Sequence, residues 1–256
     1  MDFEDTEMIE KIASTTVYAQ NLYRDFGGHV AVQGVGLVLK QGEVLGLLGP
    51  NGAGKTSTLR MLTGNLAPSV GSISICGVDL LDKPQDAKAF IGYLPETPPL
   101  YQEMTVDEYL RFAAKLHRLR RDEIQVALDR AKQRCGLSDM SKRLINNLSK
   151  GYQQRVGIAQ AIIHSPEVII LDEPTAALGV RESARVLQLI HDLRERGMPV
   201  ILISHNMQQV FEVADRIHIP RLGKRLCVIN PKDYTMSDAV AFMTGAKEAP
   251  EERVSA

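Results

Sequence analysis

The stretch Gly49-Pro50-Asn51-Gly52-Ala53-Gly54-Lys55-Thr56 decides the fold of this 256-residue chain. It matches the phosphate-loop pattern, in which two glycines separated by four residues are followed by a lysine and a hydroxyl residue. The apolar run at residues 44–48 is typical of the buried strand that such a loop follows. The sequence therefore predicts a nucleoside triphosphate site between a strand and a helix.

Each residue type in this loop has a physical role in phosphate binding. Glycines let successive backbone N–H groups turn toward an anion, and the following helix offers its positive N-terminus. Lys55 adds an ammonium group for the β- and γ-phosphates, and the Thr56 hydroxyl is a predicted Mg²⁺ ligand. We predict that nucleotide contacts come from Gly49, Pro50, Asn51, Gly52, Ala53, Gly54, Lys55, Thr56 and Ser57.

Composition narrows the class of protein. The length suits one large α/β domain, and a net charge of -1 supplies no broad positive field, so we expect no nucleic-acid partner. Cys76, Cys135 and Cys227 are far apart and have no metal-ligand spacing, which favours reduced thiols over disulfides or zinc. The N-terminus lacks an apolar leader and no apolar run could cross a bilayer, so we expect a cytoplasmic protein unless a partner holds it at a membrane.

Hydrophobic periodicity outlines the rest of the domain. Residues 17–48 and 72–76 have strand patterns and predict a small β layer around the loop. Residues 105–150 predict a helical insert, which begins with a capping box at Thr105 and Glu108. Two apolar runs, 168–171 and 200–203, flank a predicted helix at 180–196, which indicates a parallel βαβ unit.

Asp172 and Glu173 directly follow the apolar run 168–171. In phosphate-loop enzymes an acid at the end of a neighbouring strand lies beside Mg²⁺, and the next acid can face the attacking water. We therefore predict that Asp172 is a metal ligand and that Glu173 is the general base. The plainer alternative is that the aspartate only ends the strand as a turn former.

Residues 148–155, Leu-Ser-Lys-Gly-Tyr-Gln-Gln-Arg, open another predicted helix. Ser149 is a typical N-cap residue, Gly151 permits close backbone approach, and such a helix start can hold a phosphate. This stretch resembles the L-S-G-G-Q signature of ATP-binding cassette (ABC) ATPases. It lies between the phosphate loop and the Leu-Asp-Glu-Pro sequence at 171–174, as in that family, and the resemblance covers residues 15–246.

The resemblance implies an α/β fold, with a phosphate-loop NTPase core, a small antiparallel β subdomain and a helical subdomain at about residues 97–150. Residues 1–246 are then a single ABC ATPase domain, and we expect the charged, small residues 247–256 to form a disordered tail. The implied cofactors are ATP and Mg²⁺.

The resemblance also assigns residues outside the phosphate loop. Phe26 corresponds to the ring that stacks on adenine, although it could instead be an ordinary core residue. Glu96 stands where the family usually has a glutamine that meets Mg²⁺ and water. His205 resembles the histidine that contacts the γ-phosphate, which adds it to Glu173 as a catalytic candidate; a structural histidine is the alternative. Gly179 replaces an aspartate that helps couple the family's two nucleotide sites.

In such proteins two copies bind head to tail, as a homodimer or a paired cassette. Each ATP lies between one copy's phosphate loop and Ser149 and Gly151 of the other, and hydrolysis drives an integral membrane permease at the inner face of the cell membrane. Cassette proteins that act as soluble ATP switches are a second alternative, but they usually carry two cassettes or long coiled-coil inserts.

Two kinds of transporter are suggested by different parts of the chain. Residues 15–172 resemble exporter-type cassettes, whereas residues 173–246 resemble cassettes of monosaccharide importers of the fructose type. Either a recombined chain or natural divergence could produce this pattern. Because residues 93–145 would choose the permease, we expect an exporter-type partner, and a fructose-type importer is the alternative. Tyr101, Tyr109 and Arg111 are the expected contacts, although the aromatic residues could instead belong to the core.

Overall fold

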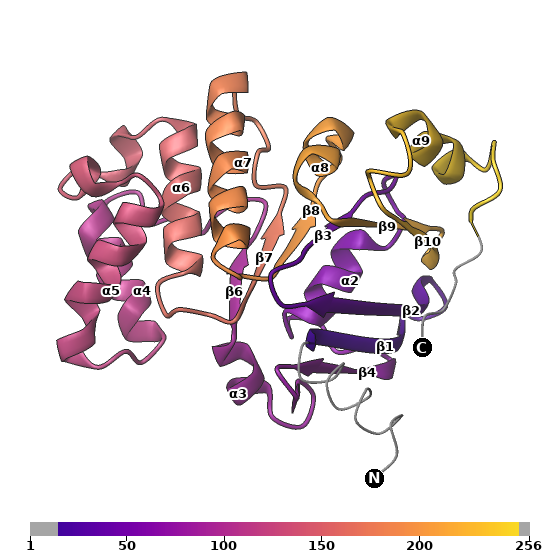
Figure 1. The fold of residues 1–256 in the computed structure, drawn as a ribbon. Helices are drawn as coiled ribbons and strands as arrows, with labels where there is room; N and C mark the ends of the chain where they lie inside the picture. Colours follow the sequence, from indigo (N-terminus) through magenta and orange to yellow (C-terminus); the bar gives the residue numbers. More distant parts are fainter. Residues whose placement is uncertain (1–14, 251–256) are drawn as a thin grey trace, which may run out of the picture.

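The computed structural model describes residues 15–250, which form a mixed six-stranded sheet, a four-stranded antiparallel sheet and surrounding helices (Figure 1). The strand order of the larger sheet is β10-β9-β3-β8-β7-β6. All neighbouring pairs are parallel except β9 with β10. Its strands are β3 (Val44–Leu47), β6 (Ile91–Leu94), β7 (Val168–Asp172), β8 (Val200–Ile203), β9 (Arg216–Arg221) and β10 (Lys224–Ile229).

The central strands β3, β7 and β8 are buried on both faces, as their continuous apolar sequences predict. Parallel strands align their carboxyl ends along one edge of a sheet. The residues that follow β3, β7 and β8 therefore come together, and they include the phosphate loop and the acids after residue 171.

The smaller sheet has the order β2-β1-β4-β5 and covers one face of the larger one. Its strands are β1 (Thr15–Asp25), β2 (Val30–Lys40), β4 (Val70–Ile75) and β5 (Val78–Asp79). Apolar residues from both sheets and from helix α2 (Lys55–Leu62) share one core. This packing holds the phosphate-loop helix between two sheets and confirms the antiparallel β subdomain.

A group of helices lies at the β6 edge of the larger sheet (Figure 1). It contains α4 (Val106–Leu116), α5 (Arg121–Arg134), two short 3₁₀ segments (Ser138–Met140 and Ile145–Asn147) and α6 (Lys150–Ala161). The predicted capping box is confirmed, because Thr105 and Glu108 exchange hydrogen bonds at the start of α4. Tyr109, Phe112, Ala113 and Leu116 recur at helical spacing in the sequence and predict an apolar stripe, but this stripe ends early because Leu116 is exposed.

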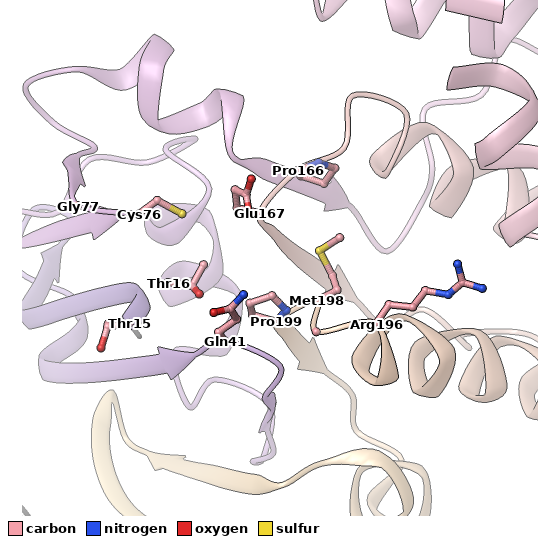
Figure 2. A pocket seen from close by; sticks show the side chains of 11 residues that line it. Thr15, Thr16, Gln41, Cys76, Gly77, Pro166, Glu167, Arg196, Met198 and Pro199 are labelled. Atoms are coloured by element: carbon pink, nitrogen blue, oxygen red, sulfur yellow. The ribbon is translucent and has the colours of Figure 1, made fainter. Parts of the chain in front are cut away.

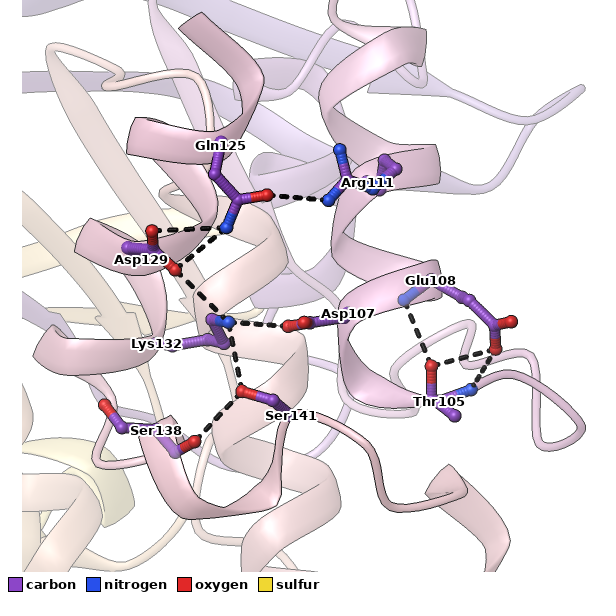
Figure 3. Close-up of polar contacts among 9 residues, drawn as sticks. All are labelled: Thr105, Asp107, Glu108, Arg111, Gln125, Asp129, Lys132, Ser138 and Ser141. Carbon is purple, nitrogen blue, oxygen red and sulfur yellow. Dashed lines mark hydrogen bonds and ion pairs between the residues drawn. The ribbon is translucent and has the colours of Figure 1, made fainter.

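One buried cation connects three parts of this helical group (Figure 3). The Nζ atom of Lys132 on α5 lies 2.6 Å from Oδ1 of Asp107 on α4 and 3.0 Å from Oγ of Ser141. It also lies 3.3 Å from Oδ1 of Asp129, one turn earlier on its own helix. Since the Lys132 side chain is almost fully buried, these oxygens replace the water that an ammonium group needs.

The remaining helices cover the other parts of the larger sheet. Helix α7 (Val180–Glu195) connects β7 to β8, in agreement with the predicted βαβ unit, and α8 (Met207–Val213) follows β8. Helix α3 (Pro84–Ala89) precedes β6, and α9 (Met236–Thr244) follows β10. Within residues 15–250 no helix is both long and apolar enough to span a bilayer.

The expected disordered tail has ordered contacts at its beginning. Lys247 forms an ion pair of 2.9 Å with Asp238 and lies over the ring of Phe242, and Ala249 packs against the main core. The difference arises because the Lys247 ammonium finds both a carboxylate and an aromatic face on α9. Residues 251–256 of the expected tail, like residues 1–14, lie outside the described part of the chain.

Candidate nucleotide-binding site

The phosphate loop leaves the carboxyl end of β3 and enters α2 at Lys55. Gly52 and Gly54 have left-handed backbone conformations, with φ of 78° and 93°. A Cβ atom at Gly54 would lie 2.7 Å from the Ala31 carbonyl oxygen, and one at Gly49 would lie 2.8 Å from that of Pro220. The loop thus needs glycine at 54 both for its backbone and for its packing, and at 49 for its packing.

Lys55 lies at the centre of this loop. Its Nζ atom donates to the carbonyl oxygens of Gly49 at 2.7 Å and Pro50 at 3.0 Å, and the residue is only 8% exposed. Burial lowers the pKa of its ammonium group, whereas Glu173 and Asp172 act to raise it. The predicted phosphate-binding lysine therefore lies close to both predicted acids of the site.

Asp172, the last residue of β7, is a nearly buried carboxyl group. Burial, together with the negative charges of Glu173 and Glu96, raises its pKa to about 6, although Arg60 and Lys55 oppose the shift. The structure therefore brings Glu96 into the electrostatic environment of Asp172. Such a concentration of carboxylates favours a bound cation.

The oxygen-rich side chains near the loop fit the chemistry of Mg²⁺. This ion is usually held by one or two carboxylates together with water and substrate phosphates, and Asp172 and the Thr56 hydroxyl supply groups of this kind. Within the described residues no group of three or more histidine, cysteine or acidic side chains could hold a metal. A magnesium ion here would thus depend on oxygens of the nucleotide.

Glu173 is held by two residues from the end of the neighbouring strand β8. Its Oε2 atom accepts a hydrogen bond of 3.1 Å from Ser204 Oγ, and its Oε1 atom lies 2.9 Å from His205 Nδ1. The Glu173 backbone has φ of 48°, a left-handed value that residues other than glycine rarely adopt. The Glu173 N–H donates a hydrogen bond to the carbonyl oxygen of Ile203. The structure thus joins the predicted base and the predicted histidine.

Two hydrogen-bonded side chains near the carboxyl ends of β7 and β8 are not predicted from the sequence. The Ser204 hydroxyl is buried and accepts a hydrogen bond from the Asn206 N–H, so that it orders both the Glu173 carboxylate and the start of α8. In the sequence, the position of Ser204 directly after the apolar run 200–203 could have indicated this role. Thr175 also donates a short hydrogen bond to Gln209 on α8, and no local pattern indicates this distant partner.

Phe26 lies at the turn between β1 and β2 and is 48% exposed. The alternative of an ordinary core residue is therefore wrong. The guanidinium carbon of Arg24 lies 4.5 Å from the centre of its ring, a cation–π arrangement that orients the aromatic group. An exposed, oriented ring is suited to stacking on a planar base.

Ser149 and Gly151 lie in a different part of the molecule, at the start of α6. The Ser149 hydroxyl accepts a 3.4 Å hydrogen bond from the Tyr152 N–H, which confirms its N-cap position. A Cβ atom at Gly151 would lie 2.6 Å from Cγ of Glu182 on α7. Both residues thus pack within the α6–α7 region rather than on the phosphate loop.

The predicted permease contacts are only partly at the surface. Tyr109 is a core residue, because its ring is 3% exposed and its hydroxyl donates to the Pro99 carbonyl oxygen at 3.3 Å. Burial raises its pKa to about 12. Tyr101 is exposed and packs edge-on against Phe112, while Arg111 donates to Gln125. The prediction of Tyr109 as a permease contact is thus wrong.

Comparisons with known proteins identify the family. A family model described as ABC transporter matches residues 32–176, which include the phosphate loop, the α6 start and the Asp172–Glu173 pair. The chain belongs to this family. It is therefore the ATP-binding subunit of an ABC transporter and an ATP hydrolase, and subunits of this kind act together with membrane permease components.

Curated relatives of this ABC ATPase include one named for fructose import and others named for different transporters. It is 44% identical to the fructose import ATP-binding protein FrcA of Rhizobium meliloti, over 93% of this chain and 97% of that protein. It is 39% identical to the ABC transporter ATP-binding protein NatA of Bacillus subtilis, over 76% and 79% of the two chains. It is 36% identical to the bacitracin transport ATP-binding protein BcrA of Bacillus licheniformis, over 83% and 69%.

Solved structures show the same fold. One described as the ATP binding subunit of an ABC transporter has a TM-score of 0.80 and 27% identity, and the match covers 90% of this chain and all of that one. Another, cbiO1 from Clostridium perfringens, part of the ABC transporter complex cbiONQ, has a TM-score of 0.81 and 26% identity over 91% and 96%.

Proposed function

We propose that this ABC ATPase energises the import of a monosaccharide, of which fructose is the first candidate. The supporting observation is the extent of the likeness to FrcA, which runs through nearly the full length of both chains at 44% identity. The likenesses to NatA and to the bacitracin transport protein are weaker and cover less of the chain. The stronger likeness to FrcA thus favours the importer alternative over the exporter-type partner expected from residues 93–145.

The arrangement around Glu173 supports a hydrolytic mechanism. Its carboxylate, fixed by Ser204 and His205, is the group that would accept a proton from the attacking water. Asp172 and the Thr56 hydroxyl would hold Mg²⁺, with Glu96 beside them. When bound, this ion neutralises charge on the β- and γ-phosphates.

The other site residues would bind and orient the nucleotide. Lys55 and the backbone N–H groups of residues 49–57 would contact the phosphates, and the exposed Phe26 ring would stack on the adenine. His205, whose side chain is largely exposed, would reach the γ-phosphate from the carboxyl end of β8.

We infer that each complete site needs two copies of the cassette. Ser149 and Gly151 pack on the α6–α7 region and not on the phosphate loop of their own chain. The positive N-terminus of α6 is therefore free to receive the nucleotide held by a second copy. Binding at both surfaces would join the two protomers head to tail and would drive the permease through cycles of closure and opening.

The decisive experiment is reconstitution with candidate permeases in lipid vesicles. A monosaccharide permease should co-purify with the chain, and its sugar should stimulate MgATP hydrolysis by the complex. The Glu173→Gln chain, assembled in the same way, is the control for contaminating ATPases. Selective recovery of an exporter-type permease, without sugar-dependent hydrolysis, would overturn the import proposal and leave the ATPase assignment intact.

A further inference from the structure

A cavity of about 450 Å³ lies at the end of the larger sheet opposite the phosphate loop (Figure 2). It is bordered by the beginning of β1, by the turn after β4, and by the loops that lead into β7 and β8. Its volume is in the range of small-molecule sites in proteins. The cavity has no part in the nucleotide site described above.

The polar side chains that border this space include Thr16, Gln41, Cys76 and Glu167. Gln41 and Glu167 are exposed, so their polar groups are accessible to a ligand. Thr16 is only 8% exposed, and its backbone carbonyl accepts a hydrogen bond from the Cys76 N–H. Its hydroxyl borders the cavity, where it can donate to and accept from a polar ligand.

The charge around the cavity limits the class of ligand. Glu167 is the carboxylate that faces the space, and its charge together with burial raises the pKa of the Cys76 thiol, which therefore stays neutral. The Arg196 side chain extends away from the cavity in Figure 2. An anion would be repelled by Glu167, and a strongly cationic ligand would find one carboxylate only among the described lining residues.

Neutral hydroxyl groups match the remaining features. Each sugar hydroxyl both donates and accepts, as do the Gln41 amide and the Thr16 hydroxyl, and Glu167 can accept from one or two of them. Pro166, Met198 and Pro199 add apolar surface beside these polar groups. Apolar surface suits the C–H face of a sugar ring.

The position of the cavity connects it to the catalytic edge. Glu167 immediately precedes β7, which ends at Asp172, and Pro199 immediately precedes β8, which is followed by Ser204 and His205. These strands are short, fully buried and closely packed, so a displacement at their amino ends is passed on to their carboxyl ends.

We propose that this cavity is a regulatory site for a neutral polyhydroxylated ligand of monosaccharide size. A bound ligand would contact the amino ends of β7 and β8 and would thereby change the rate of ATP hydrolysis at the nucleotide site, which lies at the carboxyl ends of these strands. The inference rests on the cavity alone and holds for either direction of transport.

Titration calorimetry of the purified full-length chain, without nucleotide, tests the site with D-fructose and D-glucose as probes. We expect saturable binding that weakens on the order of tenfold in Thr16→Val and in Glu167→Gln, the effect of one lost hydrogen bond. Glu103→Gln, at an exposed carboxylate before α4, is the matched control and should bind as the parent does. Thermal unfolding of each variant verifies that it is folded.

Several results would overturn the assignment. Absence of saturable sugar binding, or binding that both Thr16→Val and Glu167→Gln leave unchanged, would exclude the site. Tighter binding of spermidine or citrate, titrated in parallel, would exclude a neutral ligand as its occupant.

The regulatory role is measured separately, as MgATP hydrolysis over a range of sugar concentrations up to saturation. The kcat should change by about twofold or more in the parent and in Glu103→Gln, and the sugar concentration that gives half of this change should rise on the order of tenfold in Glu167→Gln. An unchanged rate despite saturable binding would overturn the regulatory role. These assays contain no permease, so their failure is distinct from a failure of the import proposal.

Discussion

The Nδ1 atom of His205 lies 2.9 Å from the Oε1 atom of Glu173, although the two residues are separated by a complete helix and strand. Their proximity follows from the parallel pairing of β7 with β8, which places the first residues beyond each strand side by side. The carboxylate that would accept the proton is thereby fixed from the strand next to its own.

Replacing this carboxylate should separate nucleotide binding from hydrolysis. Glu173→Gln keeps the size of the side chain and a hydrogen-bond acceptor for Ser204 but removes the base, so kcat should fall by roughly 10²- to 10⁴-fold. Its ATP affinity, measured by equilibrium dialysis, should stay near the parental value. Lys55→Ala is the opposite control, because it should lose binding. Parental turnover in Glu173→Gln would contradict the assignment of the base.

The two-copy site predicts an ATP-dependent dimer. Glu173→Gln should sediment as a dimer with MgATP and as a monomer without it, because slow hydrolysis preserves the nucleotide that joins the copies. Ser149→Arg, added to this background, should abolish the dimer by crowding the start of α6. Ser237→Arg introduces the same side chain at an exposed serine of α9 and should leave the dimer intact. A dimer indifferent to ATP and to Ser149→Arg would refute the model.

Phe26 should contribute to nucleotide affinity through its ring. Phe26→Ala is expected to weaken ATP binding by about 1–3 kcal/mol, the usual range for base–aromatic stacking. Phe26→Tyr keeps the ring and should bind ATP like the parent, and both variants should have parental thermal stability because the residue is exposed. Equal affinities of Phe26→Ala and parent for ATP would show that the ring does not contact the base.

Lys132 should stabilise the helical group to which it belongs. Lys132→Met leaves Asp107 and Ser141 without their shared donor, and we expect a loss of about 1–3 kcal/mol in the free energy of unfolding, measured in urea. Lys115→Met, on the exposed face of α4, is the matched control. Adding Asp107→Asn to Lys132→Met should recover part of the loss, and an additive double variant would argue against the pairing.

Two buried histidines should make the fold less stable in acid. Burial lowers the pKa of His164 to about 4 and that of His218 to about 3, whereas the ordinary value is 6.5. The unfolded chain therefore binds more protons below pH 6.5, and stability should fall as the pH decreases from there toward 4. Each histidine contributes up to about 1.4 kcal/mol per pH unit in this range.

Asp172 acts in the opposite direction, since its pKa is raised to about 6 and its contribution is lost as the pH rises between 4 and 6. Urea unfolding of the parent and of His164→Gln at pH 7 and pH 5 separates the effects. His164→Gln should lose less stability between these two conditions than the parent loses. Equal losses would mean that His164 titrates normally in the folded state.

Much of the nucleotide site could be predicted from short stretches of sequence. The phosphate loop, the acids after β7 and the histidine after β8 all directly follow buried strands, and parallel pairing then brings them together. The Ser149 cap could be predicted for a different reason, because an N-cap depends only on the residues of its own helix. These features depend mainly on local chemistry and on one rule of sheet topology.

Features that depend on distant packing could not be predicted in this way. Tyr109 lies at an apolar position of α4 and is buried by the helical group, and its assignment to the permease surface failed because a short stretch of sequence does not show which aromatic residues the group encloses. Ser204 and Gln209 reach their partners across a strand and a helix. Lys247 is ordered by Asp238 and Phe242 on α9, although the sequence around it is typical of a disordered end.

The left-handed backbone at Glu173 carries a consequence for the evolution of this site. A side chain there costs on the order of 1 kcal/mol, which glycine would not incur, so Glu173→Gly should relieve conformational strain while it eliminates the acid. The stability of the fold and the proposed base thus oppose each other at a single position, so a substitution that favours the fold would remove the acid.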